Sequence, residues 1–387
     1  MVPANPVLSR RALNRAVLSR QSLLERSPLL PYDAIHALAG LQAQAPLAPH
    51  VGLWSRLLGY CPAALDELYD TRRVVRANLM RATVHLTTAA DALRWQRMLA
   101  PVGERGVQAA FGKRLVGVDL GALVAEAERL LHEEALTTAE LGRRLVDSFP
   151  GYDADALAYG ARGRLALIHV PPRGKWGASG GTTRQTTFPA WLEQSPEPAA
   201  SPDELVLRYL AAFGPASVQD AQAWSGLTRL AEVVERLSPK LAVFRDEGGR
   251  LLYDLPDAPR PAESVAAPVR FLPEYDNLFF GYADRTRFVP DLRKPPIPPG
   301  NGARTGTVFV DGEWRATWKI ALPTRRSRGS ADGESPAAAV LSVTLFGNVG
   351  DEEVAAIERE GHELARFIAD PQVPVAPVRI DVEGAVG

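Results

Sequence analysis

The sequence predicts an α+β fold in which three tandem winged-helix units precede a β-rich C-terminal region. Two observations predict this fold. Three times along the chain, a group of amphipathic helices is followed by strand-like or turn-rich segments, the element order of a winged-helix unit. After residue 262 the sequence changes to strand-like runs separated by turns. We expect the units at residues 1–116, 117–200 and 201–262, and the β-rich region with a terminal helix at 263–387.

The first unit begins with two expected helices between Ser9 and Ala39, with Ser9 as a plausible N-cap. A third helix is expected from His50 to Leu58, where Val51, Trp54 and Leu57 would pack. Residues 72–88 follow, and their last part, 82–88, alternates like a half-buried strand. Three helices followed by a strand give the first winged-helix pattern.

The same order recurs in the next two units. The second has expected helices at 119–132, 137–146 and 153–167, then a Pro- and Gly-rich segment at 168–177 that suits a loop or wing. A proline-rich linker at 194–202 separates it from helices at 203–213, 217–224 and 228–237. The run 241–255 contains Gly248-Gly249 between two alternating stretches, which indicates a hairpin.

The C-terminal region is expected to be mainly β-structure. Strand-like segments lie at 269–282, 307–320 and 340–345, and Asp311-Gly312 is a strong hairpin turn within the second of them. An acidic helix is expected at 351–369. Residues 325–339 have the small, polar composition of a mobile loop, and 384–387 that of a loose tail.

Composition limits the function. The 387 residues carry 44 basic and 45 acidic side chains, so the net charge of −1 favours neither nucleic acid nor membrane, and a polyanion site must be a local basic patch. One cysteine, Cys61, excludes an intramolecular disulfide and a multi-cysteine metal site. With no signal peptide and no apolar run long enough to span a bilayer, we expect a cytoplasmic protein without membrane partners.

A short polar motif in the first unit is the first candidate site. Gln42 and Gln44 flank one alanine between Gly40 and Pro46. Residues two apart point in different directions in a helix but share a face in extended backbone. Gly40 is a natural helix C-cap, and Pro46 disfavours helical geometry in the residue before it. We therefore expect both glutamines to leave the helix and point into one cavity.

Two further groups of residues are candidates for a site. Alternation along the strand places Arg81, Thr83 and His85 on one polar face, in the same unit as the glutamines. Basic clusters at residues 10–20 and 325–328 fit a solvated surface. A third cluster lies on the later helices and wing of the second unit, the elements that approach DNA in this fold class. Its members are Arg143, Arg144, Arg162, Arg164, Arg173 and Lys175.

Three segments resemble the AlkZ/YcaQ-type DNA glycosylases: Leu38–Pro49, Arg81–Leu86 and Leu272–Asn277. The resemblance implies winged-helix units curved around DNA and excision of N7-alkylated purines, including unhooking of interstrand crosslinks. It also implies a catalytic Gln-x-Gln motif, which Gln42 and Gln44 match. The sequence shows no nucleotide-binding loop and no zinc-binding helix, so no cofactor and no metal are expected.

The implied chemistry suits neutral amides. An N7-alkylated guanine is cationic, so it leaves as a neutral base without a general acid. The remaining task is to position a water against a sugar that acquires oxocarbenium character. We expect Gln42 and Gln44 to hold this water together. Since the motif has no lysine nucleophile, the expected product is an abasic site. We expect the substrate to be double-stranded DNA that contains alkylated purines, and the protein to be a monomer. A crosslinked base cannot leave the helix freely, which favours approach from a groove over base flipping.

Two other functions remain open at this point. A non-catalytic DNA-binding regulator would keep the winged-helix scaffold without the chemistry. A peptide- or small-molecule-binding module would use the β-rich C-terminal region.

Overall fold

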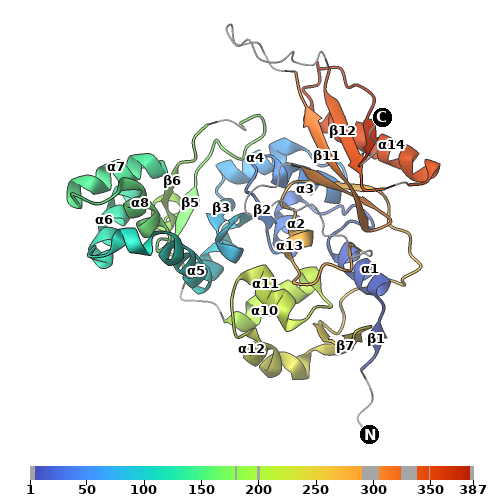
Figure 1. Cartoon of the computed structure of the whole chain (residues 1–387), viewed down its shortest axis with the longest axis horizontal. Helices are drawn as coiled ribbons and strands as arrows, with labels where there is room; N and C mark the ends of the chain where they lie inside the picture. Colours follow the sequence, from blue (N-terminus) through green and yellow to red (C-terminus); the bar gives the residue numbers. More distant parts are fainter. Residues whose placement is uncertain are drawn as a thin grey trace.

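The computed structural model describes residues 5–178, 181–197, 201–289, 305–323, 338–347 and 349–383. Figure 1 shows the elements of residues 31–88 near the centre of the molecule and the N-terminus at its lower edge. The helices of the second predicted unit lie to one side, and the C-terminal sheet and helix α14 lie at the upper end. Three sheets organise the described residues, with strand orders β1-β7-β8, β2-β4-β3-β5-β6 and β13-β12-β11-β10-β9.

The strands that form these sheets are short. They are β1 (Val7–Leu8), β2 (Leu41–Gln42), β3 (Val74–Asn78), β4 (Val84–Thr88), β5 (Leu167–His169), β6 (Gln185–Thr187), β7 (Ala242–Asp246), β8 (Leu251–Asp254), β9 (Arg270–Leu272), β10 (Gly306–Val310), β11 (Glu313–Ala321), β12 (Val340–Leu345) and β13 (Arg379–Val382).

Helices cover these sheets and fill the space between them. They are α1 (Arg10–Arg20), α2 (Pro31–Ala37), α3 (Ala48–Arg56), α4 (Pro62–Asp70), α5 (Ala89–Phe111), α6 (Leu120–Glu133), α7 (Thr138–Ser148), α8 (Ala154–Arg162), α9 (Phe188–Leu192), α10 (Pro202–Phe213), α11 (Val218–Ser225), α12 (Leu230–Leu237), α13 (Asn277–Phe280) and α14 (Asp351–Ile368), with 3₁₀ turns η1 (Met80–Ala82), η2 (Gly112–Leu115) and η3 (Ser238–Lys240). No helix in the described ranges is long and apolar enough to cross a membrane.

The sheets join segments that the sequence assigns to different units. Strands β5 and β6, the expected wing region of the second unit, extend the first unit's sheet because β5 pairs antiparallel with β3. In a separate sheet, the N-terminal strand β1 pairs parallel with β7 and so adds a strand to the β7–β8 hairpin of the third predicted unit; Figure 1 shows β1 beside β7. A mixed α and β architecture is confirmed, whereas three separate winged-helix units are not confirmed and the boundaries between the units stay predictions.

Several sequence-based predictions of elements are confirmed. The glycine pair in 241–255 lies between paired strands β7 and β8, and Asp311-Gly312 links β10 to β11. Helix α14 and strand β12 match their predicted ranges closely. These elements were predictable because their signals are local. Glycine and aspartate mark a tight turn, and acidic residues mark the first turn of a helix.

Other predictions were wrong. The strand expected over 82–88 begins only at Val84, because η1 turns the chain at 80–82. Helix α8 ends at Arg162 instead of 167. Helices α4 and α5 were missed. The expected mobile loop falls largely in 324–337 and the tail in 384–387, which lie outside the described residues.

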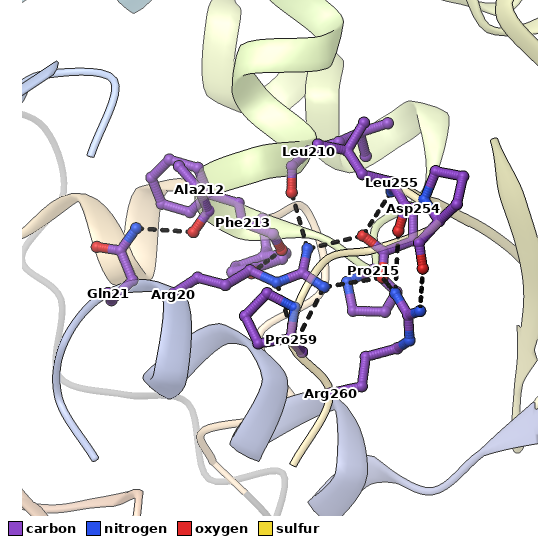
Figure 2. A network of polar contacts seen from close by, with 12 residues as sticks. Arg20, Gln21, Leu210, Ala212, Phe213, Pro215, Asp254, Leu255, Pro259 and Arg260 are labelled. Carbon is purple, nitrogen blue, oxygen red and sulfur yellow. Dashed lines mark hydrogen bonds and ion pairs between the residues drawn. The ribbon is translucent and has the colours of Figure 1, made fainter. Parts of the chain in front are cut away.

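A buried ion pair fixes α1 to the third unit. Figure 2 shows Arg20 and Arg260 converging on Asp254 at the end of β8. The Arg20 guanidinium donates to both carboxylate oxygens of Asp254 at 2.7 and 2.8 Å and to the Leu210 carbonyl at 2.8 Å. Gln21 donates to the Ala212 carbonyl beside it. Arg20, a member of the N-terminal basic cluster, therefore holds the fold together.

Candidate active site

The polar motif follows a sharp turn at the end of α2. Ala39 and Gly40 both have positive φ angles, of 54° and 90°. The Gly40 amide donates to the Ile35 carbonyl at 3.0 Å and the Ala39 amide to that of His36 at 3.1 Å, which together form a Schellman helix end. A Cβ at Gly40 would lie 2.6 Å from Cγ2 of Thr87, so only glycine lets the turn approach β4 this closely.

Immediately after this turn, the chain is extended. Gln42 pairs with His85 across the β2–β4 ladder, and the Ala43 amide donates to the Val84 carbonyl at 2.7 Å. Leu41 and Ala43 are buried in the apolar cluster beneath this sheet. Gln42 therefore belongs to the opposite face of β2, and Gln44 follows in a bend two residues later. The prediction that the helix ends before the two glutamines is confirmed.

The two glutamines differ in how they are held. Gln42 is 6% exposed, and its Oε1 accepts a hydrogen bond from Arg81 Nη2 at 2.8 Å. Gln44 is half-buried, and its side chain forms no hydrogen bond within the described residues. Because arginine only donates, the Gln42 amide is oriented with its oxygen toward Arg81 and its NH₂ group away from it. The Gln42 amide is thus held by Arg81, whereas the Gln44 amide has no partner among the described residues.

Arg81 is the hub of the surrounding polar network. Its Nη1 donates to the Trp224 carbonyl at 2.7 Å, and its Nη2 also lies 3.3 Å from Asn277 Oδ1 and 3.4 Å from His85 Nε2. The expectation that Arg81 belongs to the strand of His85 is wrong, because Arg81 and Ala82 have φ angles of 55° and 56°. Two consecutive left-handed residues other than glycine cost about 1–2 kcal/mol each, and such backbone persists where the surroundings enforce it.

The charges of the network follow from its burial. Burial, and secondarily the nearby Arg285 guanidinium, lowers the pKa of Arg81 to about 9, so Arg81 is still charged at neutral pH. Burial and then the charge of Arg81 lower the pKa of His85 to about 3. His85 is therefore neutral, with Nδ1 donating to the Thr83 carbonyl at 2.9 Å and the Nε2 lone pair facing Arg81.

The segment after β9, residues 273–277, also contacts the glutamine motif and Arg81. Asn277 donates to the Gly40 carbonyl at 3.1 Å, and Asp276 forms an ion pair with Arg56 at 2.8 Å in which both side chains are 1% exposed. Burial raises the pKa of the nearby Glu274 carboxyl. Sequence analysis assigned no role to Asn277. Its signal in the sequence was its place in Leu272–Asn277, one of the three segments that carry the family resemblance.

Arg76, to which the sequence-based predictions gave no role, holds the backbone of the glutamine motif. Arg76 of β3 donates to the Ala43 carbonyl and to the Arg173 carbonyl, both at 2.9 Å. Gly174 lies over its side chain, where a Cβ would be 2.8 Å from Arg76 Cδ, so Arg76 is only 2% exposed. The main chain between the two glutamines is therefore tied to the loop after β5.

Comparison with known proteins agrees with this architecture. The solved structure of DNA glycosylase AlkZ from Streptomyces sahachiroi superposes with a TM-score of 0.73 over 97% of this chain and 100% of that chain, at 19% identity. An interstrand DNA cross-link repair glycosylase from the same organism is 25% identical over 388 residues, covering 92% of this chain and 96% of the relative. The family model described as DNA glycosylase AlkZ-like matches residues 35–367. The chain belongs to the AlkZ-like DNA glycosylase family.

Membership of the AlkZ-like family confirms the resemblance found in the sequence, and it gives no support to a non-catalytic regulator. The matched residues contain the glutamine motif, Arg81, His85 and Asn277. They also contain all six basic residues that were predicted to contact DNA.

These six basic residues of the AlkZ-like chain have different surroundings. Arg143 is exposed on α7, whereas Arg144 is paired with Glu134 at 2.6 Å and Lys175 with Asp70. Arg162 lies over the Tyr159 ring, and its burial lowers its pKa. Arg164 donates to the Gly160 carbonyl at 2.8 Å and Arg173 to that of Gly181 at 3.1 Å. None is hydrogen-bonded to either glutamine within the described residues, and their contacts with DNA stay predictions.

Proposed function

We propose that this protein is a monofunctional DNA glycosylase that hydrolyses the N-glycosidic bond of cationic N7-alkylated purines in duplex DNA. What supports the proposal is that two glutamines, two residues apart, follow the end of a helix, with Gln42 anchored by Arg81 and Gln44 without a hydrogen bond among the described residues. Two neighbouring amides can hold a single water, which is the arrangement that hydrolysis of an activated glycosidic bond needs.

The two amides take different roles in this proposal. Gln42, whose oxygen accepts from Arg81, presents its NH₂ group and orients the water through the water oxygen. Gln44 has its amide oxygen available to accept a hydrogen bond from the same water and to direct its dipole toward the developing oxocarbenium ion. The charge of Arg81 polarises the Gln42 amide and strengthens it as a donor.

No proton donor is required at the leaving group. His85 is neutral at physiological pH and its Nδ1 proton is used by the Thr83 carbonyl, so it does not protonate a base. This fits a substrate that already carries the positive charge. An uncharged purine adduct would need protonation before it could leave, and we propose that the enzyme does not excise such adducts.

Interstrand crosslinks through two N7 positions carry the same cationic leaving group on each strand. The similar Streptomyces sahachiroi protein is named an interstrand DNA cross-link repair glycosylase, which supports crosslink unhooking by this chain as well. We propose that the enzyme acts as a cytoplasmic monomer on double-stranded DNA, without a metal. The six basic residues, Arg143, Arg144, Arg162, Arg164, Arg173 and Lys175, would contact DNA phosphates, and Arg81 and His85 would lie near the lesion and support Gln42.

The proposal is tested by incubating the protein with a duplex that contains one N7-methylguanine and then treating the DNA with hot alkali. Strand cleavage at the lesion, release of free N7-methylguanine and no protein–DNA adduct after borohydride treatment are expected of monofunctional hydrolysis. No cleavage by the wild-type protein in large excess would refute the glycosylase activity. A trapped covalent adduct would refute the water mechanism.

A further inference from the structure

Several buried arginines in this structure are neutralised by a carboxylate. Arg20 pairs with Asp254, Arg56 with Asp276 and Arg15 with Asp311. Leaving a buried cation without such a partner is costly, because its desolvation is not repaid by an attractive charge. An unpaired buried cation beside a candidate active site therefore suggests that its anion comes from the substrate.

Arg81 and Arg285 are unpaired in this sense. Every hydrogen-bond acceptor of Arg81 is neutral, namely the Gln42 and Asn277 amide oxygens, the Trp224 carbonyl and the His85 ring. Arg285 donates through Nε to the Phe279 carbonyl at 3.0 Å, and its two terminal nitrogens form no hydrogen bond or ion pair within the described residues. The charge that acts most strongly on Arg81 is the like charge of Arg285, so neither cation is compensated.

One aromatic ring links the two cations. The guanidinium carbons of Arg81 and Arg285 lie 5.5 and 5.6 Å from the centroid of the half-buried Phe280 ring. A third cation, the exposed Arg105 of α5, donates to the Gly226 carbonyl at 3.1 Å, and a Cβ at Gly226 would lie 3.2 Å from the Arg81 Cα. Two uncompensated cations thus share one ring, and Arg105 is hydrogen-bonded to a residue beside the Arg81 backbone.

Arg76 also lacks a carboxylate but is not part of this feature. Its two terminal nitrogens are used by backbone carbonyls, and the loop at Gly174 seals it from solvent. Arg285, by contrast, is partly exposed and has free donors. Of these arginines, Arg285 is the one that an external anion can reach.

We propose that Arg285, which shares the Phe280 ring with Arg81, binds one phosphodiester of the DNA strand that carries the lesion, next to the damaged nucleotide. The Arg285 terminal nitrogens would donate to the non-bridging oxygens, and the Phe280 ring would keep the guanidinium in place. Because Arg81 also holds Gln42, this phosphate would set the distance between the sugar and the two glutamines. The inference rests on the proposed glycosylase function for the identity of its ligand.

The test uses the full-length protein and a duplex with one N7-methylguanine whose 2′-fluoro sugar prevents excision. Affinity is measured for wild type and Arg285→Gln over a range of salt concentrations. Loss of one phosphate contact should reduce the slope of log affinity against log salt by about 0.9. Arg285→Lys, which keeps the charge, should retain the slope, and so should Arg236→Gln, which removes an exposed cation paired with Asp203 on the third unit.

A methylphosphonate scan then locates the phosphate. One neutral linkage within two nucleotides of the lesion should weaken the wild-type complex, and the same linkage should cost Arg285→Gln nothing further. An unchanged salt slope in Arg285→Gln, or equal losses for variant and wild type at every linkage, would overturn the inference. Both measurements use uncleavable DNA, so their outcome is independent of whether the wild-type protein excises the base.

Discussion

The two glutamines should affect stability very differently when each is replaced by alanine. Gln42→Ala removes the acceptor that lies 2.8 Å from Arg81 Nη2 in a site that is almost closed to solvent. A hydrogen bond to a charged group contributes about 1.5–3 kcal/mol, and removing one partner also leaves the other desolvated. We therefore expect Gln42→Ala to lower the free energy of unfolding by about 2 kcal/mol.

Gln44→Ala should change the free energy of unfolding by less than about 0.5 kcal/mol, because the side chain is half-buried and has no hydrogen bond to lose among the described residues. The assay is urea denaturation followed by circular dichroism, with both variants compared at the same ionic strength. Folding of Gln44→Ala is then intact when its activity is measured.

A double-mutant cycle shows whether the loss in Gln42→Ala comes from Arg81. In an Arg81→Met background the Gln42 acceptor has already lost its donor, so Gln42→Ala should cost at least 1 kcal/mol less than in the wild type, by the usual range of about 0.5–3 kcal/mol for coupled neighbours. Additive effects of the two substitutions would refute the anchoring of Gln42 by Arg81. Equal destabilisation by Gln42→Ala and Gln44→Ala would refute the difference between the two amides.

Three further predictions concern the turn, the proton supply and pH. Gly40→Ala should slow excision and lower the unfolding midpoint, since its Cβ would lie 2.6 Å from the Thr87 methyl group at a φ of 90°; an unchanged midpoint would show that the turn can relax. Glu274→Gln should excise N7-methylguanine at the wild-type rate, because a cationic base needs no acid, and a loss above tenfold would contradict this mechanism. His85, with its pKa lowered to about 3 by burial and by Arg81, is neutral when folded and takes up a proton below about pH 6.5 only when unfolded. Stability should therefore fall with decreasing pH between about 6.5 and 3, by roughly 1.2 kcal/mol from pH 7 to 5.5, and His85→Asn should remove that part of the dependence in urea titrations.

Local sequence signals predicted the motif well. Gly40 and Pro46 interrupt the helix on either side of the glutamines, so a non-helical segment between them followed from residue type alone. The hairpins at 248–249 and 311–312 were found for the same reason. Each of these features is decided within a few residues of the chain.

Contacts between distant segments could not be predicted in this way. Nothing in the Met80–Thr83 sequence requires a left-handed turn, which is supported by a hydrogen bond from Arg81 to a carbonyl 143 positions away. Asn277 reaches Gly40 across 237 positions, and β5 joins the first sheet through β3 after the whole of α5 to α8. The pairing that anchors Gln42 and the charges around it became visible only in the folded chain.

The most direct test of the account is the single-turnover rate at which wild-type protein and Gln44→Ala release N7-methylguanine from duplex DNA, measured at protein concentrations that saturate binding. We predict release by the wild type and a rate lower by roughly 100-fold in Gln44→Ala, the loss typical of one preorganised catalytic dipole, with unchanged affinity for the uncleavable duplex. A Gln44→Ala variant that releases the base at the wild-type rate would contradict the role of the glutamine pair.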